Sequence, residues 1–289
     1  MRFEKWQALG NDYMILERAE LPFELTPARI RRLCEGHLGV YADGVLLLSP
    51  PTDPAHVADL RIFNPDGSEA ELSGNGAREA ILYLRHRGWT DRDDFTISTL
   101  AGEIHPRITG PHTCTVDIGN ARLSSPDFPA GPPDGLGEVL SGGRAWRFRH
   151  VSIGNPQCAI RVDSSQELAA LELVTIGPGI EADAQFPNRT NVSWYALLDA
   201  GPPARIRARI FERGVGETLS SGTGASGAAV AHVVQAGGEV GGSVVVELDG
   251  GELEVDVGAD LRVNLTGWAR PVFEGRLSKD FEKELHETE

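Results

Sequence analysis

The chain has 289 residues, of which 40% are apolar, and a formal net charge of −15 at pH 7. This length allows one large domain or two of ordinary size. The negative charge argues against a nucleic-acid partner and against an anionic membrane surface, because no basic stripe is available to neutralise phosphates. A small anionic substrate stays compatible with the composition, since a binding site needs only a local positive potential.

The N-terminus, the cysteines and the histidines narrow the class of protein further. The first residues, MRFEKWQALGND, contain no apolar segment of signal-peptide length, and no run reaches the roughly 18 apolar residues of a membrane span. The three cysteines are odd in number and far apart, which fits a reducing cytoplasm and argues against a disulfide framework. The eight histidines show no His-x-x-x-His or His-x-Glu spacing, so we expect no metal site.

Short strand-like runs alternate with turns along most of the chain. In chain order these runs cover residues 43–49, 59–68, 94–99, 114–119, 149–155, 157–162, 191–198, 204–214, 243–257 and 261–268. Many strands with one central helix in each half indicate α+β domains, not the regular strand–helix alternation of a doubly wound sheet. The Pro- and Gly-rich residues 124–143 are typical of a linker or a surface excursion.

One helix is expected in each half, directly after a Ser-Gly-x-Gly-Ala motif. In the first helix, Ala77, Ala80, Ile81 and Leu84 recur at helical spacing, and Gly88 lies near the C-cap. Three arginines are expected off this apolar face: Arg78, Arg85 and Arg87. The second helix is small and apolar nearly all round, which predicts burial, and it is expected to end at residues 237–238.

The two motifs belong to an internal repeat. FNPDGSEAELSGNGAREA at residues 63–80 aligns without gaps with FERGVGETLSSGTGASGA at residues 211–228. The identical pairs are Phe63/Phe211, Glu69/Glu217, Ser73/Ser221, Gly74/Gly222, Gly76/Gly224, Ala77/Ala225 and Ala80/Ala228. A Gly-Asn pair precedes each copy, at Gly10-Asn11 and at Gly154-Asn155. Two similar domains in tandem are the simplest interpretation.

Residues 222–227 also form a Gly-x-Gly-x-x-Gly pattern, which raises a dinucleotide site as an alternative. Such a fingerprint should follow a buried strand, whereas the preceding ERGVGETLSS is polar and glycine-rich. Glu247 stands at about the distance of a ribose-binding acid, but nothing comparable follows the first copy. We therefore favour a paired anion site, in which two helix N-termini bind a carboxylate or a small zwitterion.

Six segments, in order, resemble the diaminopimelate epimerase family of cofactor-independent amino-acid racemases. They are ALGNDYMIL, LGVYADGVLLL, FNPDGSEAELSGNGAR, VSIGNPQCAI, FPNRTNVSW and FERGVGETLSSGTGASGAA. The resemblance implies two pseudo-symmetric α+β domains, each a mixed, strongly curved sheet around a central helix, with the active site in the cleft between them. Residues 1–120, with 267–289 returning to them, would form the first domain and residues 121–266 the second. The implied reaction interconverts LL- and meso-diaminopimelate by α-proton transfer without a cofactor.

The resemblance also assigns a substrate shell. Glu212 would accept from an ammonium group, and Arg213 would pair with the distal carboxylate. Backbone amides of Gly74, Asn75, Gly222 and Thr223 would face the reacting α-carboxylate, where fixed dipoles stabilise the developing charge. The polar ends of the substrate would be bound by four asparagines: Asn11, Asn64, Asn155 and Asn191.

Simpler interpretations exist for several of these positions. An asparagine before a turn is often turn chemistry. The Glu212–Arg213 pair could be a surface ion pair of little energetic value. Glu69 and Glu217 could cap the loop before each helix, and the Ala-Asp-Gly at residues 42–44 is expected to be a turn.

The chain departs from the family pattern at the reacting groups. Ser73 and Ser221 occupy the positions of the family's two catalytic cysteines, and Gln157 replaces a common histidine. A serine hydroxyl is far less acidic than a thiol and needs an adjacent base. Cys158 is expected to be a buried core thiol and not a substitute base.

Three functions are compatible with these serines. The first, which we favour, is an epimerase that uses Ser73 and Ser221. The second is a same-fold racemase or dehydratase with altered chemistry, and the third is a non-catalytic amino-acid-binding homologue. The expected partner is a small amino acid, and the sequence is compatible with a homodimer without specifying one.

Overall fold

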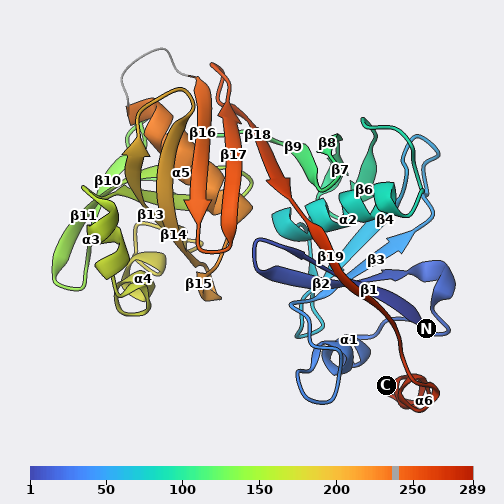
Figure 1. Cartoon of the computed structure of the whole chain (residues 1–289). Coiled ribbons are helices and arrows are strands. Elements are labelled where there is room, and N and C mark those ends of the chain that lie inside the picture. Colours follow the sequence, from blue (N-terminus) through green and yellow to red (C-terminus); the bar gives the residue numbers. More distant parts are fainter. Residues whose placement is uncertain (236–240, 289) are drawn as a thin grey trace. The chain divides into compact units, whose positions relative to one another are not determined.

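The computed structural model describes residues 1–235 and 241–288. The chain divides into two compact units, unit 1 (Met1–Val116 with Gly267–Glu289) and unit 2 (Asp117–Thr266). Each unit is a mixed β-sheet with few helices, so the fold is α+β as predicted (Figure 1). The chain passes from one unit to the other within β9 (Thr113–Asn120) and again within β18 (Arg262–Trp268).

The sheet of unit 1 has the strand order β19-β1-β2-β3-β4-β6-β7, with β5 paired to β4. Its strands are β1 (Arg2–Ala8), β2 (Asn11–Glu17), β3 (Val45–Ser49), β4 (Asp59–Phe63), β5 (Glu69–Ala70), β6 (Ile97–Thr99), β7 (Gly102–Ile104) and β19 (Arg270–Arg276). Its helices are α1 (Pro27–Cys34), α2 (Gly74–His86) and α6 (Lys279–Glu287), with a short 3-10 turn η1 (Arg18–Glu20).

The second sheet has the order β10-β11-β12-β13-β14-β16-β17-β18-β9-β8, with β15 paired to β14. Its further strands are β8 (Pro106–Gly110), β10 (Leu136–Ser141), β11 (Arg144–Ser152), β12 (Pro156–Arg161), β13 (Asn191–Asp199), β14 (Ala204–Glu212), β15 (Gly216–Thr218), β16 (Gly242–Leu248) and β17 (Gly251–Val257). The helices of unit 2 are α3 (Ser165–Ala170), α4 (Leu173–Glu181) and α5 (Gly222–Gln235).

The two units repeat one topology. The pairings β1/β2, β2/β3, β3/β4 and β4/β5 are antiparallel, parallel, antiparallel and antiparallel. The pairings β11/β12, β12/β13, β13/β14 and β14/β15 follow the same series. A parallel neighbour then follows in each unit, β6 beside β4 and β16 beside β14. The predicted pseudo-symmetric pair of domains is confirmed.

Each sheet curves around one central helix. Helix α5 contacts β11 to β14, β16 and β17, and helix α2 contacts β1, β2, β3 and β19 (Figure 1). The inward residues alternate along the strands, as Leu253, Val255 and Val257 do in β17, because successive strand side chains point to opposite faces. The predicted burial of the second helix is confirmed over the residues from Gly222 to His232 that the structure places in the interior. Its predicted end at residues 237–238 lies outside the described residues.

The prediction for Arg78 was wrong. The first helix was expected to turn its arginines away from its apolar face, but Arg78 is 0% exposed and so is Glu79. The helix has no solvent face at these positions, because α2 is buried continuously from Asn75 to Leu84. The guanidinium of Arg78 donates to Asn75 Oδ1. Burial lowers the pKa of Arg78 and raises the pKa of Glu79, against the opposing effect of the neighbouring charge.

Other differences lie at the periphery. Residues 124–143 are not only a linker, because Leu136–Ser141 form the edge strand β10 on β11 and Phe128 lies in the core of unit 2. The helices α1, α3, α4 and α6 were not predicted. Three of them begin at a residue whose hydroxyl accepts a backbone N–H in the first turn, namely Thr26, Ser164 and Ser278. Cys158 lies in the core of unit 2, which confirms that prediction.

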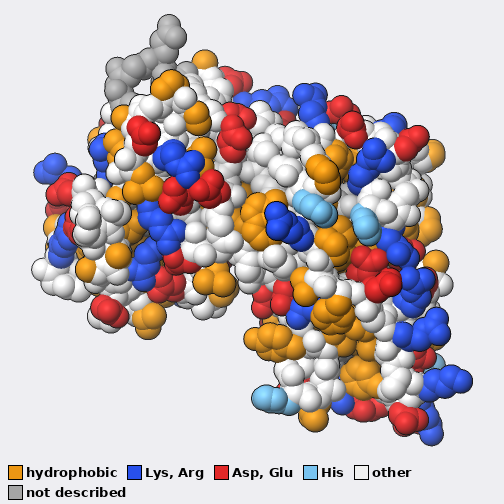
Figure 2. All heavy atoms as spheres, in the orientation of Figure 1, with side chains coloured by type: hydrophobic (Ala, Val, Ile, Leu, Met, Phe, Trp, Pro, Cys, Tyr) orange, Lys and Arg blue, Asp and Glu red, His pale blue; other side chains and the backbone are white. Residues whose placement is uncertain are grey.

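Acidic and basic side chains are interspersed on the face shown in Figure 2, without a continuous basic stripe. Among the helices of residues 1–235 and 241–288, none combines the length and the apolar character that a membrane crossing requires.

Candidate active site

The predicted site residues divide into two sets, one in each unit, which we call half-sites. Half-site 1 comprises Asn11, Asn64, Ser73, Gly74 and Asn75. Half-site 2 comprises Asn155, Asn191, Glu212, Arg213, Ser221, Gly222 and Thr223. In both, a long strand (β4 or β14) turns into a short one (β5 or β15), and the chain then reaches a serine that begins the central helix.

Both serines cap their helices in the same way. Ser73 Oγ accepts the Gly76 N–H at 3.1 Å, and Ser221 Oγ accepts the Gly224 N–H at 3.3 Å. The first N–H groups of any helix have no intrahelical partner, and they carry the positive end of the helix dipole. Each half-site therefore presents a helix N-terminus suited to a carboxylate.

An arginine–glutamate ion pair links the two strands of the hairpin that precedes each serine. Arg61 donates from Nε and Nη2 to the two oxygens of Glu69, both at 2.8 Å. Arg209 donates from Nε and Nη2 to Glu217 Oε1 at 3.0 and 2.6 Å. Glu69 and Glu217 thus bind across the hairpin, and sequence reasoning missed their partners although Arg-Ile-Phe is repeated at residues 61–63 and 209–211.

The repeated Gly-Asn pairs form tight turns. Gly10 and Gly154 have φ angles of 84° and 79°, a region that glycine enters without steric cost. In half-site 1, Asn11 Nδ2 donates to Asp43 Oδ2 at 2.8 Å. Asp43 also accepts the Asp12 N–H at 3.0 Å, and Asp12 pairs with the largely buried Lys5 at 3.0 Å. Residues 42–44, predicted only as a turn, hold Asn11 in place.

The remaining polar groups of half-site 1 have local partners. Asn64 Nδ2 donates to Ser68 Oγ at 3.0 Å within the β4–β5 turn. Asn75 is buried and its side-chain oxygen accepts from Arg78. The hydroxyl of Tyr13 on β2 donates to Ser73 Oγ at 3.2 Å. Sequence reasoning missed Tyr13, although ALGNDYMIL contains it, because only the packing of β2 on α2 reveals this contact.

In half-site 2, a carboxylate lies beside the serine. Glu212 Oε1 accepts from Thr218 Oγ1 at 2.8 Å, and the same hydroxyl lies 3.5 Å from the carbonyl oxygen of Ser220, the neighbour of Ser221. Burial raises the pKa of Glu212, while the nearby Thr218 and Ser221 hydroxyls oppose the rise. A carboxylate with a raised pKa that contacts a hydroxyl is able to accept its proton.

The amides of half-site 2 form two short chains of hydrogen bonds. Asn155 Nδ2 donates to Thr223 Oγ1 at 3.3 Å, and Gln157 Nε2 donates to Asn155 Oδ1 at 2.6 Å. Asn191 Oδ1 accepts the Arg213 N–H at 2.9 Å. The exposed Arg213 side chain donates from Nη1 to the Asn188 carbonyl at 2.8 Å, so it is tethered at the rim of the half-site.

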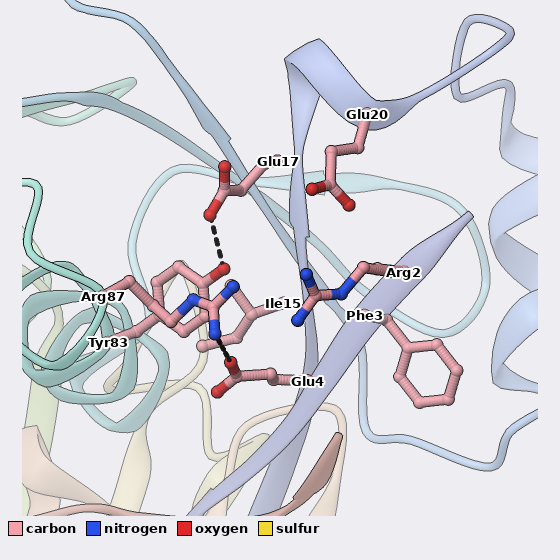
Figure 3. Close-up of a pocket in the computed structure, with 8 residues that line it drawn as sticks. All are labelled: Arg2, Phe3, Glu4, Ile15, Glu17, Glu20, Tyr83 and Arg87. Atoms are coloured by element: carbon pink, nitrogen blue, oxygen red, sulfur yellow. Dashed lines mark hydrogen bonds and ion pairs between the residues drawn. The ribbon is translucent and has the colours of Figure 1, made fainter. Parts of the chain in front are cut away.

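A separate polar hollow of ≈ 260 Å³, part of it open solvent, lies beside β1, β2 and the end of α2 (Figure 3). Two of its three acidic groups have partners within the unit, since Glu17 accepts from Tyr83 at 2.7 Å and Glu4 pairs with Arg87 at 3.3 Å. It contains none of the predicted site residues.

Solved structures share this architecture. A phenazine biosynthesis protein of the PhzF family from Bacillus anthracis has a TM-score of 0.67 at 18% identity, with 96% of this chain and 99% of that chain covered. A hydroxyproline epimerase from Agrobacterium vitis, with bound trans-4-OH-L-proline, has a TM-score of 0.65 at 15% identity, with 97% and 93% covered. At these identities the likeness shows a shared fold, which a PhzF-family protein and an amino-acid epimerase both have.

The particular family follows from the sequence comparisons. The family model for diaminopimelate epimerase matches residues 3–124 and 149–270. A diaminopimelate epimerase from Pelotomaculum thermopropionicum is 39% identical over 284 residues, which are 95% of this chain and 98% of that protein. One from Thioalkalivibrio sulfidiphilus is 38% identical over 283 residues, with 96% and 99% covered. The chain belongs to the diaminopimelate epimerase family.

The caps predict a measurable loss of stability. We expect Ser73→Ala to lower the free energy of unfolding by about 1 kcal/mol, because the Gly76 N–H loses its acceptor. Urea denaturation followed by circular dichroism measures this loss. Ser164→Ala, which removes a cap from the peripheral helix α3, is the matched control. It should lower the free energy of unfolding by a similar amount without affecting the reaction of the substrate. An unchanged unfolding midpoint in Ser73→Ala would show that the hydroxyl does not cap α2.

Proposed function

We propose that this chain interconverts LL- and meso-diaminopimelate by removing an α-proton at one face and returning a proton at the other. Ser73 and Ser221 carry the proton transfer. The family supports the substrate, since the similar full-length relatives are named diaminopimelate epimerase.

The closeness of Glu212 to Ser221 carries this proposal, because Thr218 Oγ1 contacts both Glu212 Oε1 at 2.8 Å and the carbonyl oxygen of Ser220 at 3.5 Å. A serine requires a base within hydrogen-bonding reach before it can remove a proton, and Glu212 supplies one. The α5 N-terminus and the Gly224 N–H contact Ser221 Oγ, so they stabilise negative charge that develops on it.

In this proposal the other half-site residues bind the substrate. The helix N-termini at Gly74, Asn75, Gly222 and Thr223 receive the reacting α-carboxylate. Arg213, tethered through Asn188 and Asn191, pairs with the distal carboxylate. The side chains of Asn11, Asn64, Asn155 and Asn191 contact the polar ends of the substrate. In this assignment Glu212 acts on Ser221, so it does not also hold the substrate ammonium.

A second candidate function is binding without turnover. The observation that favours it is that, within residues 1–235 and 241–288, Ser73 hydrogen-bonds to Tyr13 and Gly76 and to no carboxylate. Binding of the ligand carboxylates by the helix N-termini and Arg213 does not depend on the acidity of the serines. A ligand would therefore still bind if proton transfer failed.

Replacing Ser73 and Ser221 with cysteine tests the proposed reaction. We expect the unmodified protein to exchange the α-proton of LL-diaminopimelate in D2O slowly, and Ser73→Cys/Ser221→Cys to do so at least about 100-fold faster, because each pKa unit changes the population of the basic form about tenfold. NMR measures the loss of the α-proton signal and the appearance of the meso isomer. Ser226→Cys, inside α5, is the matched control and should leave the rate unchanged. If neither protein exchanges the proton at high concentration while the ligand binds saturably, the function is binding.

The pH dependence tests Glu212. Exchange should fall as pH decreases through the raised pKa of Glu212, because only the ionised carboxylate accepts a proton. Glu212→Gln should abolish exchange. Thr218→Val should move the acid limb to higher pH without abolishing exchange, because the Thr218 hydrogen bond lowers the pKa of Glu212. An acid limb that does not move in Thr218→Val would contradict the role of Glu212.

We propose in addition that the protein is cytoplasmic and forms a homodimer. The three cysteines are unpaired thiols, which suits a reducing compartment. The edge strand β19 exposes Val272 and Phe273, an apolar pair on a strand open to further pairing. Sedimentation equilibrium at micromolar concentration should give twice the chain mass, and a monomer would refute the dimer. Fractionation of the source cells tests the location.

A further inference from the structure

Three polar side chains of unit 2 form a chain of hydrogen bonds that ends in the first turn of α5. Gln157 on β12 donates from Nε2 to Asn155 Oδ1 at 2.6 Å. Asn155 in turn donates from Nδ2 to Thr223 Oγ1 at 3.3 Å, and Thr223 is the second residue of α5. The chain therefore links the interior of unit 2 to the helix N-terminus, where an anion would bind.

The inner end of this chain is enclosed. Gln157 is 0% exposed, and its Oε1 has no hydrogen-bond partner in the part of the chain that the structure describes. A Cβ at Gly227 would lie 2.9 Å from Gln157 Cβ and 3.0 Å from Gln157 Cγ. Glycine in a helix interior is destabilising, so the close approach of Gln157 gives a reason for a glycine at this point of α5. Packing thus fixes the side chain from which the chain of hydrogen bonds starts.

Burial also decides which way the amide of Gln157 faces. If the amides of Gln157 and Asn155 both turned over, Gln157 Oε1 would accept from Asn155, and both N–H groups of Gln157 Nε2 would lack an acceptor. Buried N–H groups without an acceptor are rarer in proteins than carbonyl oxygens without a donor. The orientation in the structure gives Nε2 an acceptor and leaves only the oxygen without a donor, so it is the favoured one.

The direction of the chain has a consequence at Thr223. A hydroxyl group has one proton to donate and two lone pairs that accept. Thr223 Oγ1 accepts from Asn155, and within residues 1–235 and 241–288 no group accepts the Thr223 hydroxyl proton. Thr223 is partly exposed, in contrast to Gln157. Its hydroxyl proton is therefore available to a ligand that binds at the start of α5.

We propose that Gln157 is a positioning residue, which sets the direction of this chain so that Thr223 presents its hydroxyl proton to a carboxylate of an amino-acid ligand. This inference rests on the proposed function, because it concerns the same ligand, and it deepens that function with residues of unit 2 alone. Gln157 acts through Asn155 and Thr223 and does not touch the ligand. Hydrogen bonds to a charged acceptor are stronger than those to a neutral one, so the chain favours an anionic group at this position.

A double-mutant cycle tests whether Gln157 acts through Thr223. Calorimetry with LL-diaminopimelate measures the affinity of Thr223→Val, which keeps the backbone N–H, and of Gln157→Met, which keeps the length of the side chain. Each should weaken binding about tenfold, because in the second variant Asn155 is free to turn over and accept the Thr223 proton. The double variant should also lose only about tenfold, since both changes break one chain.

Gln185→Met is the matched control. It removes another glutamine amide of unit 2, which donates to the Glu138 carbonyl at 3.0 Å, and should leave the affinity unchanged. Parental affinity in Gln157→Met, or a loss of about 100-fold in the double variant, would overturn the inference while the proposed function stands.

A second readout does not require a ligand. The side-chain amide protons of Asn155, identified in ¹⁵N-labelled protein by their loss in Asn155→Asp, should shift more in Thr223→Val than in Gln157→Met, because Asn155 Nδ2 donates to Thr223. The opposite order would mean that the chain runs the other way and would overturn the inference. If the unmodified protein binds no LL-diaminopimelate, the proposed function fails, and these resonances alone then support or overturn the direction of the chain.

Discussion

A helix enclosed by a sheet must find partners for its first peptide N–H groups, and this requirement governs both half-sites. Helices α2 and α5 are buried along most of their length and become exposed at their C-terminal ends, so the partners of their first N–H groups must come largely from the protein itself. A serine hydroxyl satisfies one N–H group of each helix, and the others face the place where a carboxylate would bind. The groups that hold the fold together at these points are therefore also the groups proposed to react.

Serine is well suited to capping a helix and poorly suited to transferring a proton. It ranks among the best helix N-caps, whereas its hydroxyl is a weak base without help. The structure supplies that help unequally, with a carboxylate at Ser221 and a phenol at Ser73. The hairpins that precede the serines are alike in both units. In each, an arginine–glutamate pair, Arg61–Glu69 or Arg209–Glu217, links the long strand to the short one.

The architecture was predictable from the sequence because a repeated motif at constant spacing reports a repeated unit whatever its detailed packing. The alternation of apolar residues likewise predicted most strands. Arg78 was placed wrongly because helical periodicity assumes a solvent-facing side, and an enclosed helix has none. The peripheral strand β10 was missed because proline and glycine dominate the composition around it.

Within the candidate site, the order of motifs identified the serines and the asparagines but not the contacts that give them their chemistry. Tyr13 meets Ser73 across 60 residues of sequence, and Asp43 meets Asn11 across 32. Such pairs depend on how β2, β3 and α2 pack together. Glu212 was recognised, but its closeness to Ser221 follows from the turn between β14 and β15, which the sequence does not specify.

The distribution of sulfur in this chain has a consequence for its chemical durability. Oxidants and alkylating agents attack accessible thiolates, and a thiolate at a helix N-terminus is an especially reactive target. Here those positions carry oxygen, and burial raises the pKa of the Cys34 and Cys114 thiols to about 12 and that of Cys158 well above its ordinary value. Peroxide would meet no thiolate at the capping residue of either half-site. The exchange of sulfur for oxygen gives up intrinsic reactivity and leaves the two capping positions without a thiol to oxidise.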